Sequence, residues 1–128
     1  MIRIDLNDPR PIEDQLVAAL RLAMARREVA PGDALPSARQ LAGDLGVHWN
    51  TVARAYRRLH DEGLIAVRHG RRTIVLEGEA DRSPAARASL RAELVNAITV
   101  GRLHGLSRRE LTDIFKEALE HIQERTSS

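Results

Sequence analysis

The spacing of apolar residues in the first quarter of the chain predicts a strand and a helix. Apolar and polar residues alternate over residues 2–6, which is the pattern of a short strand. Pro11 suits the first turn of a helix, and an apolar stripe running to about Arg27 follows it at Ile12, Leu16, Ala19, Leu20, Ala23 and Met24. The turn-forming residues 30–33 then end this helix.

Two shorter helix patterns come next, joined by a glycine. Ser37 and Gln40 have the spacing of a capping box, and the apolar face of their helix consists of Leu41, Ala42 and Leu45. Gly46 suits a tight turn. The following helix is expected to begin near His48 and to end at Gly63, with an inward face of Val52, Ala55, Tyr56 and Leu59.

A basic hairpin is expected after these helices. Residues 65–68 and 73–76 have β-like composition and flank a turn that Gly70 permits, His69-Gly70-Arg71-Arg72. Two helices joined by a tight turn and followed by such a hairpin are the layout of a winged helix-turn-helix. In that fold the second of the two helices enters the DNA major groove.

The last third of the chain predicts a helical tail. Residues 77–84 have the composition of a linker, and the first helix beyond them has a stripe of Leu90, Leu94, Ala97 and Ile98. Gly101 and Gly105 bracket a turn, and Ser107 with Glu110 forms a second capping box. The second tail helix has a regular stripe of Leu111, Ile114, Phe115, Ala118, Leu119 and Ile122.

These patterns predict a mainly α fold with a small β wing. The predicted parts are a winged helix-turn-helix domain over residues 1–76, a linker over 77–84 and a two-helix tail over 85–125. We expect the tail to form a homodimer through Leu90, Leu94, Ile98 and the whole stripe of the second tail helix.

Composition excludes several classes of protein. The chain has 128 residues, 43% of them hydrophobic, which is enough for one compact domain and a small appendage. It has no cysteine, which rules out disulfides, thiol catalysis and cysteine zinc sites. The amino terminus is too short and charged for a signal peptide, and no apolar run approaches the ~20 residues of a membrane span. We therefore expect a cytoplasmic protein with no membrane partner.

Charge is concentrated in the region of the predicted helix-turn-helix and wing. Residues 39–72 hold seven arginines against three acidic residues, a net charge of +4, whereas the whole chain carries only +2. A local basic excess indicates a polyanion such as double-stranded DNA. The five histidines have no metal-binding spacing, and the chain has no nucleophile motif or phosphate-cradling glycine loop. We expect no enzyme activity, no cofactor and no metal site.

The outward face of the third helix is the predicted DNA reader. The first turn of such a helix meets base edges, so His48, Trp49 and Asn50 are expected there, with Thr51, Arg54 and Arg57 beside them. Alternatively, Asn50 and Thr51 only satisfy the helix start, and Trp49 packs against the turn instead of contacting DNA. Tyr56 has the spacing of a core residue.

Further DNA contacts are expected from the helix before it and from the wing. Arg39 lies in a first helical turn, where positive charge gains nothing from the helix dipole, so a phosphate or guanine contact is the better interpretation. The wing is expected to hold the phosphate backbone through Arg68, His69, Gly70, Arg71 and Arg72. Alternatively, it is a solvated basic loop without DNA contacts.

Several motifs together resemble the GntR family of bacterial transcription regulators. They are Pro11-Ile-Glu-Asp-Gln-Leu16, Pro31-Gly-Asp-x-Leu-Pro-Ser-x-Arg39, Leu41-Ala-x-x-Leu-Gly-Val47, Asn50-Thr-Val-x-Arg-Ala-Tyr56 and Glu62-Gly-Leu-Ile65. The two-helix tail resembles the short YtrA-like branch. The resemblance implies DNA contacts from Arg39, from the residues after Val47 and from the wing. The chain has Trp49 where the family often has arginine, and its wing lacks a glycine and an aromatic residue typical of the family.

The sequence therefore predicts a sequence-specific, dimeric transcription regulator, most readily a repressor that occludes a promoter at a near-palindromic operator. An unidentified small-molecule effector stays open as a further partner. The alternative is a protein-interaction module that keeps the winged-helix fold but binds DNA weakly or without sequence preference.

Overall fold

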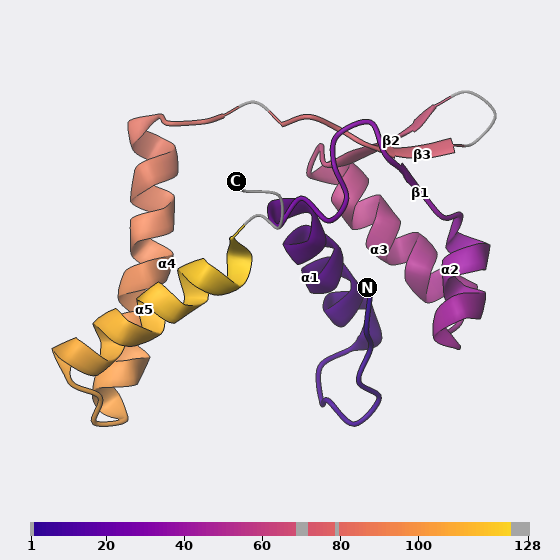
Figure 1. Ribbon diagram of the computed structural model, residues 1–128. Coiled ribbons are helices and arrows are strands. Elements are labelled where there is room, and N and C mark those ends of the chain that lie inside the picture. Colours follow the sequence, from indigo (N-terminus) through magenta and orange to yellow (C-terminus); the bar gives the residue numbers. More distant parts are fainter. Residues whose placement is uncertain (1, 69–71, 79, 124–128) are drawn as a thin grey trace. The chain divides into compact units, whose positions relative to one another are not determined.

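The computed structural model describes residues 2–68, 72–78 and 80–123, which form two compact units (Figure 1). One unit holds the chain up to Gly78, and the other runs from there to Gln123. The described residues form five helices and one antiparallel sheet of three short strands. The predicted class, mainly α with a small β wing, is confirmed.

The first unit is a winged helix-turn-helix. Its helices and strands are α1 (Ile12–Ala25), β1 (Ala34–Leu35), α2 (Ala38–Leu45), α3 (Trp49–Asp61), β2 (Ile65–Arg68) and β3 (Arg72–Val75). The sheet order is β1-β3-β2, and both pairs are antiparallel. Helix α3 packs against α1 and α2 and leads directly into β2, so the hairpin of β2 and β3 forms the wing (Figure 1).

The core of this unit lies where the apolar faces of α1 and α3 meet. Leu16, Val52 and Leu59 are fully buried, and each such side chain contributes about 1.5–3 kcal/mol of hydrophobic stabilisation. Ile65 and Val75, paired across β2 and β3, are also buried and belong to the same cluster. The periodic stripes therefore placed most of this core, but they omitted Val17, which is fully buried.

Local signals set the turn between α2 and α3. Ser37 Oγ accepts a hydrogen bond from the Gln40 backbone N–H at 3.1 Å and caps α2. Gly46 ends the helix at φ +71°, in the left-handed region that side chains with a Cβ disfavour. Three residues, 46–48, separate the end of α2 from the start of α3 at Trp49.

The predicted amino-terminal strand is wrong, because residues 2–6 are irregular. The buried side chain of Gln15 on α1 takes the place of a strand partner. Its Oε1 accepts from the Asp5 backbone N–H at 3.0 Å, and its Nε2 donates to the Asp5 carbonyl at 3.1 Å. Ile2 and Ile4 still pack against the core. The alternation of apolar and polar residues therefore correctly indicated a segment with one buried side, but this segment does not pair with another strand.

Strand β1 was not predicted, because two residues are too few for a periodic signal. Its Leu35 is buried and lies opposite Thr73 of β3. The pairing extends to Asp33, whose carbonyl accepts from the Val75 N–H at 2.9 Å. The segment assigned to a turn is therefore also the outer edge of the sheet.

The second unit is a helical hairpin of α4 (Pro84–Leu103) and α5 (Arg108–Ile122). Ser83 caps α4, and Pro84 occupies its first position, where a missing N–H costs nothing. The capping box of Ser107 and Glu110 is present with both of its hydrogen bonds, each 3.1 Å long. Among the described residues, no helix is both long and apolar enough to cross a membrane.

Candidate nucleic-acid interface

The first turn of α3 presents the predicted base-reading residues. His48, Trp49 and Asn50 are exposed, whereas Thr51 is half-buried. His48 caps the helix: its Nδ1 accepts a hydrogen bond from the Asn50 backbone N–H at 3.1 Å. A neutral imidazole that accepts at Nδ1 carries its proton on Nε2, so the outer nitrogen of His48 is a donor.

Two side chains from neighbouring helices stack at this end of α3. The Arg39 guanidinium carbon lies over the Trp49 ring, 4.7 Å from the ring centroid. The His48 and Trp49 rings are stacked as well, with their centroids 6.2 Å apart and their planes at 25°. Trp49 nevertheless keeps 41% of its surface exposed. The indole is therefore fixed by its neighbours and still reachable from outside.

Arginines further along α3 are tied to α1 by carboxylates. Arg54 Nε donates to Glu13 Oε1 at 2.9 Å, and Arg58 Nη1 donates to Glu13 Oε2 at 3.0 Å and to Asp14 Oδ1 at 2.7 Å. The hydrogen bonds from Arg54 and then Arg58 lower the pKa of the Glu13 carboxyl below its ordinary value. Sequence reasoning missed Glu13, because it lies 41 residues from Arg54 and no local pattern links them.

Tyr56 holds α3 to the segment that precedes α2. Its ring is buried, with 8% of its surface exposed, and its hydroxyl donates to the Pro36 carbonyl at 2.7 Å. Burial raises the pKa of Tyr56 to about 12. The expected core position is confirmed, and the buried hydroxyl has a partner, as a polar group in a core requires.

The described part of the wing has an arginine at the end of β2 and another at the start of β3. Arg68 and Arg72 pair in the register of β2 and β3, and the Arg72 side chain is exposed. The predicted contacts of His69, Gly70 and Arg71 lie outside the described residues. Val67, which sequence reasoning did not select, leaves 63% of its surface exposed on β2. The described part of the wing thus combines charge with an exposed apolar side chain.

A hollow of about 490 Å³ lies between α2, α3 and the wing. Arg39, Trp49 and Arg57 line it on the helical side, and Val67 and Thr73 line it on the wing side. The predicted DNA contacts at Arg39, at the start of α3 and at Arg57 therefore share one surface. Because both cationic and apolar side chains line it, the surface can contact both phosphates and bases.

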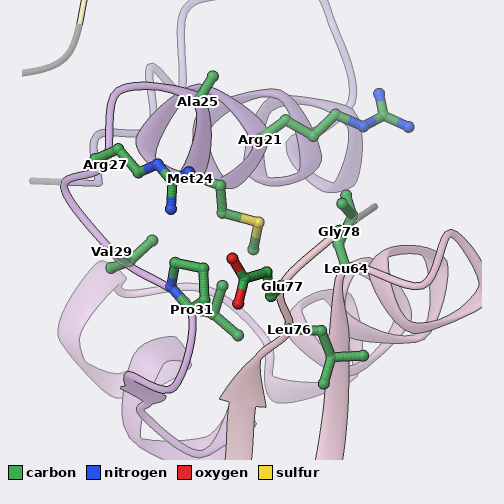
Figure 2. A pocket seen from close by; sticks show the side chains of 11 residues that line it. Arg21, Met24, Ala25, Arg27, Val29, Pro31, Leu64, Leu76, Glu77 and Gly78 are labelled. Atoms are coloured by element: carbon green, nitrogen blue, oxygen red, sulfur yellow. The ribbon is translucent and has the colours of Figure 1, made fainter. Parts of the chain in front are cut away.

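A second hollow, of about 460 Å³, lies where the chain leaves the first unit (Figure 2). Figure 2 shows Met24 reaching from α1 toward Glu77, with Val29 and Pro31 on the opposite side from Leu64. Its walls are mostly apolar, and its size is that of a small-ligand pocket.

The predicted dimer residues lie on faces that the tail leaves uncovered. Leu90 is 59% exposed and Leu119 56%, and exposure is also high for Leu94, Ile98, Ile114, Phe115, Ala118 and Ile122. Leu111 alone of this set is half-buried, because it packs on Gly101. An apolar groove of about 820 Å³ runs between α4 and α5, lined by Leu94, Ile98, Ile114 and Phe115 among others.

The helix-turn-helix and its wing define the class of winged helix-turn-helix DNA-binding proteins. Comparison with known families then identifies the chain. Residues 12–75 match the family described as bacterial regulatory proteins, gntR family. The protein belongs to the GntR family of transcription regulators, which confirms the resemblance drawn from its motifs.

Individual relatives place it near the YtrA type. It is 38% identical over 77 residues to the transcriptional repressor YtrA of Bacillus subtilis, a match that covers 60% of this chain and 59% of that protein. It is 35% identical over 109 residues to the transcriptional regulator Rv1152 of Mycobacterium tuberculosis, covering 85% and 86%. The solved structure of YtrA from Sulfolobus acidocaldarius has a TM-score of 0.63 and 39% identity, covering 77% of this chain and 97% of that one.

Proposed function

We propose that the protein is a homodimeric repressor that binds a near-palindromic operator and blocks transcription by occluding the promoter. The observation that carries this proposal is the surface shared by Arg39, Trp49 at the start of α3, and Arg57. YtrA of B. subtilis, to which the chain is similar, is a transcriptional repressor. A bound dimer would prevent polymerase from entering the same DNA.

The DNA contacts divide into two kinds. His48, Trp49 and Asn50 stand at the amino-terminal end of α3, the part of a recognition helix that meets base edges. Thr51, Arg54 and Arg57 are assigned to phosphates along the same helix, and Arg39 joins them from α2. The wing residues Arg68, His69, Gly70, Arg71 and Arg72 would add contacts to the backbone that depend on salt but little on sequence.

Dimerisation is proposed to occur through the tail. Leu119, Phe115 and Ile98 are each about half exposed in the single chain, and contiguous apolar surface of this kind marks a protein interface. A two-fold dimer repeats the same patch on both subunits. It would present two α3 helices to half-sites about one DNA turn, ~10 bp, apart.

A small-molecule effector is an open part of the proposal. The hollow of Figure 2, with Met24 and Glu77 on its walls, is one place within the first unit that could receive such a ligand. Ligand bound there would lie next to the segment that leads to the tail. We therefore expect such a ligand to change the affinity of the dimer for DNA.

The test is footprinting with the full-length protein on DNA taken from upstream of its own gene, followed by transcription in vitro. We expect protection of one short, near-palindromic site and less transcript from that promoter. Binding should weaken steeply with salt, with a logarithmic slope near −0.9 for each phosphate neutralised. Weak binding without a protected site would instead favour a protein-interaction module on the same fold.

A further inference from the structure

We infer that Trp49 is a positioning residue whose indole ring holds the Arg39 guanidinium in place to read a guanine in the operator. The inference rests on the proposed DNA-binding role of α3 and deepens it, because it assigns a base to one pair of side chains.

The fold brings the two side chains together. Arg39 is the second residue of α2 and Trp49 is the first residue of α3, and a turn of three residues that begins at Gly46 joins the two helices. The guanidinium carbon lies 4.7 Å from the indole centroid, within the ~6 Å range of a cation–π contact. The arginine is thus attached to the recognition helix, although it belongs to the helix before it.

The indole is itself held by the start of α3. The His48 ring stacks with Trp49, and His48 is fixed by the hydrogen bond that Nδ1 accepts from the Asn50 backbone N–H. A ring fixed in this way is a firm support for a long side chain. Because Arg39 is ordered before DNA arrives, it loses less rotamer freedom on binding.

Arg39 differs from the arginines further along α3 in what holds it. Arg54 and Arg58 form ion pairs with Glu13. For Arg39, in contrast, the structure records no carboxylate partner within the described ranges, and the indole face holds it instead. When the flat face of a guanidinium lies on an aromatic ring, its N–H groups still point outward in the plane of the guanidinium. Two of them can then donate to a pair of acceptors.

The place of this pair favours a base over a phosphate. It stands at the amino-terminal end of α3, where a recognition helix approaches base edges. Guanine offers the O6 and N7 acceptors in the major groove, and a bidentate arginine is their usual partner. A single guanine in each half-site is therefore assigned to the Arg39–Trp49 pair.

The experiment selects binding sites from a library of randomised DNA duplexes with the full-length protein. It uses wild type, Arg39→Ala, Trp49→Leu, Trp49→Phe and the double variant Arg39→Ala with Trp49→Leu. Wild type should enrich one guanine per half-site, and Arg39→Ala should lower that preference about tenfold, the scale of one bidentate contact. Trp49→Leu should lower it at the same position, whereas Trp49→Phe should retain it because a ring remains.

The double variant should be no worse than Arg39→Ala alone, because the two residues act as one unit. The melting temperatures of the variants should match that of wild type, which excludes a general loss of fold.

The inference is overturned if Trp49→Leu keeps the full guanine preference or changes a different position. It is also overturned if Arg39→Ala weakens binding equally on all sequences, since Arg39 would then hold a phosphate. If wild type enriches no sequence at all, the proposed function fails together with the inference. Specific binding that does not respond to Trp49 overturns the inference alone.

Discussion

Gly101 of α4 lies directly beneath the Leu111 side chain of α5, so that a Cβ at Gly101 would stand 2.6 Å from Leu111 Cδ2. This contact sets how closely the two tail helices approach, and it explains why Gly101 is buried in an otherwise exposed helix. We expect Gly101→Val to destabilise the tail by about 1–3 kcal/mol, the usual cost of overpacking. Chemical denaturation of the full-length protein measures this difference.

Two alanine variants serve as controls for that prediction. Gly43 of α2 has open space where its Cβ would be, so Gly43→Ala should stabilise the protein by about 0.5–1 kcal/mol through helix propensity alone. Gly101→Ala should fall short of that gain, because Leu111 must move aside. Equal gains at both positions would contradict the tight contact.

The hydrogen bond from Tyr56 to the Pro36 carbonyl should contribute measurably to stability. Tyr56→Phe keeps the buried ring but leaves the Pro36 carbonyl without this donor. We expect a loss of about 1 kcal/mol in the free energy of unfolding, with the helix content unchanged by circular dichroism. A variant as stable as wild type would mean that water replaces the hydroxyl without cost.

Alkaline pH should destabilise the protein through the same residue. The pKa of Tyr56 is raised to about 12 in the folded state by burial, against about 10 in an unfolded chain. The unfolded state therefore loses its proton first, and stability falls as pH rises from 10 to 12, by at most about 1.4 kcal/mol per pH unit from this group.

The measurement is direct because Tyr56 is the single tyrosine and the chain has no cysteine. Ultraviolet absorbance of tyrosinate should report its titration alone. Tyr56→Phe should remove this part of the pH dependence while leaving any other alkaline loss in place. A midpoint near 10 in the folded protein would contradict the buried position.

Neutralising Glu13 should strengthen binding to DNA. Glu13→Gln removes the carboxylate that pairs with Arg54 and Arg58. Arg58 keeps its ion pair with Asp14, so Arg54 is the guanidinium that becomes more available to phosphates. We expect a gain of about threefold in affinity at low salt, together with a steeper salt dependence. Glu117→Gln, in α5 of the second unit, makes the same change of charge and should have little effect. Weaker binding by Glu13→Gln would show that the ion pairs hold α3 in its binding position.

Charges placed in the apolar stripe of α5 should abolish the dimer. Leu111→Asp combined with Phe115→Asp would bury two carboxylates in the proposed interface, which is strongly unfavourable. Sedimentation should then show monomers, and affinity for a two-part operator should fall sharply. Asp113→Lys, an exposed position outside the stripe, is the control. A double variant that still sediments as a dimer would place the interface elsewhere.

Most of the helices could be predicted because their signals are local. Helices begin at Ser37 and Ser107 and end at Gly46 through contacts with residues three or four positions away. The apolar stripes predict the face that each helix buries. The same local reasoning erred over residues 2–6, where the partner was a side chain, Gln15, and not a strand. It also failed to predict β1, a strand that forms through its pairing with β3.

The sequence by itself determined the class of fold, the helix-turn-helix and the apolar faces of the tail, because helix periodicity and capping act within a few residues. The tertiary structure alone decided that Glu13 pairs with Arg54 and that Arg39 rests on Trp49. Those contacts join different helices, and their geometry depends on how α1, α2 and α3 pack. Arg39 and Arg54 look equivalent in the sequence, but the structure distinguishes them. Arg54 is held by a carboxylate and Arg39 by an aromatic ring.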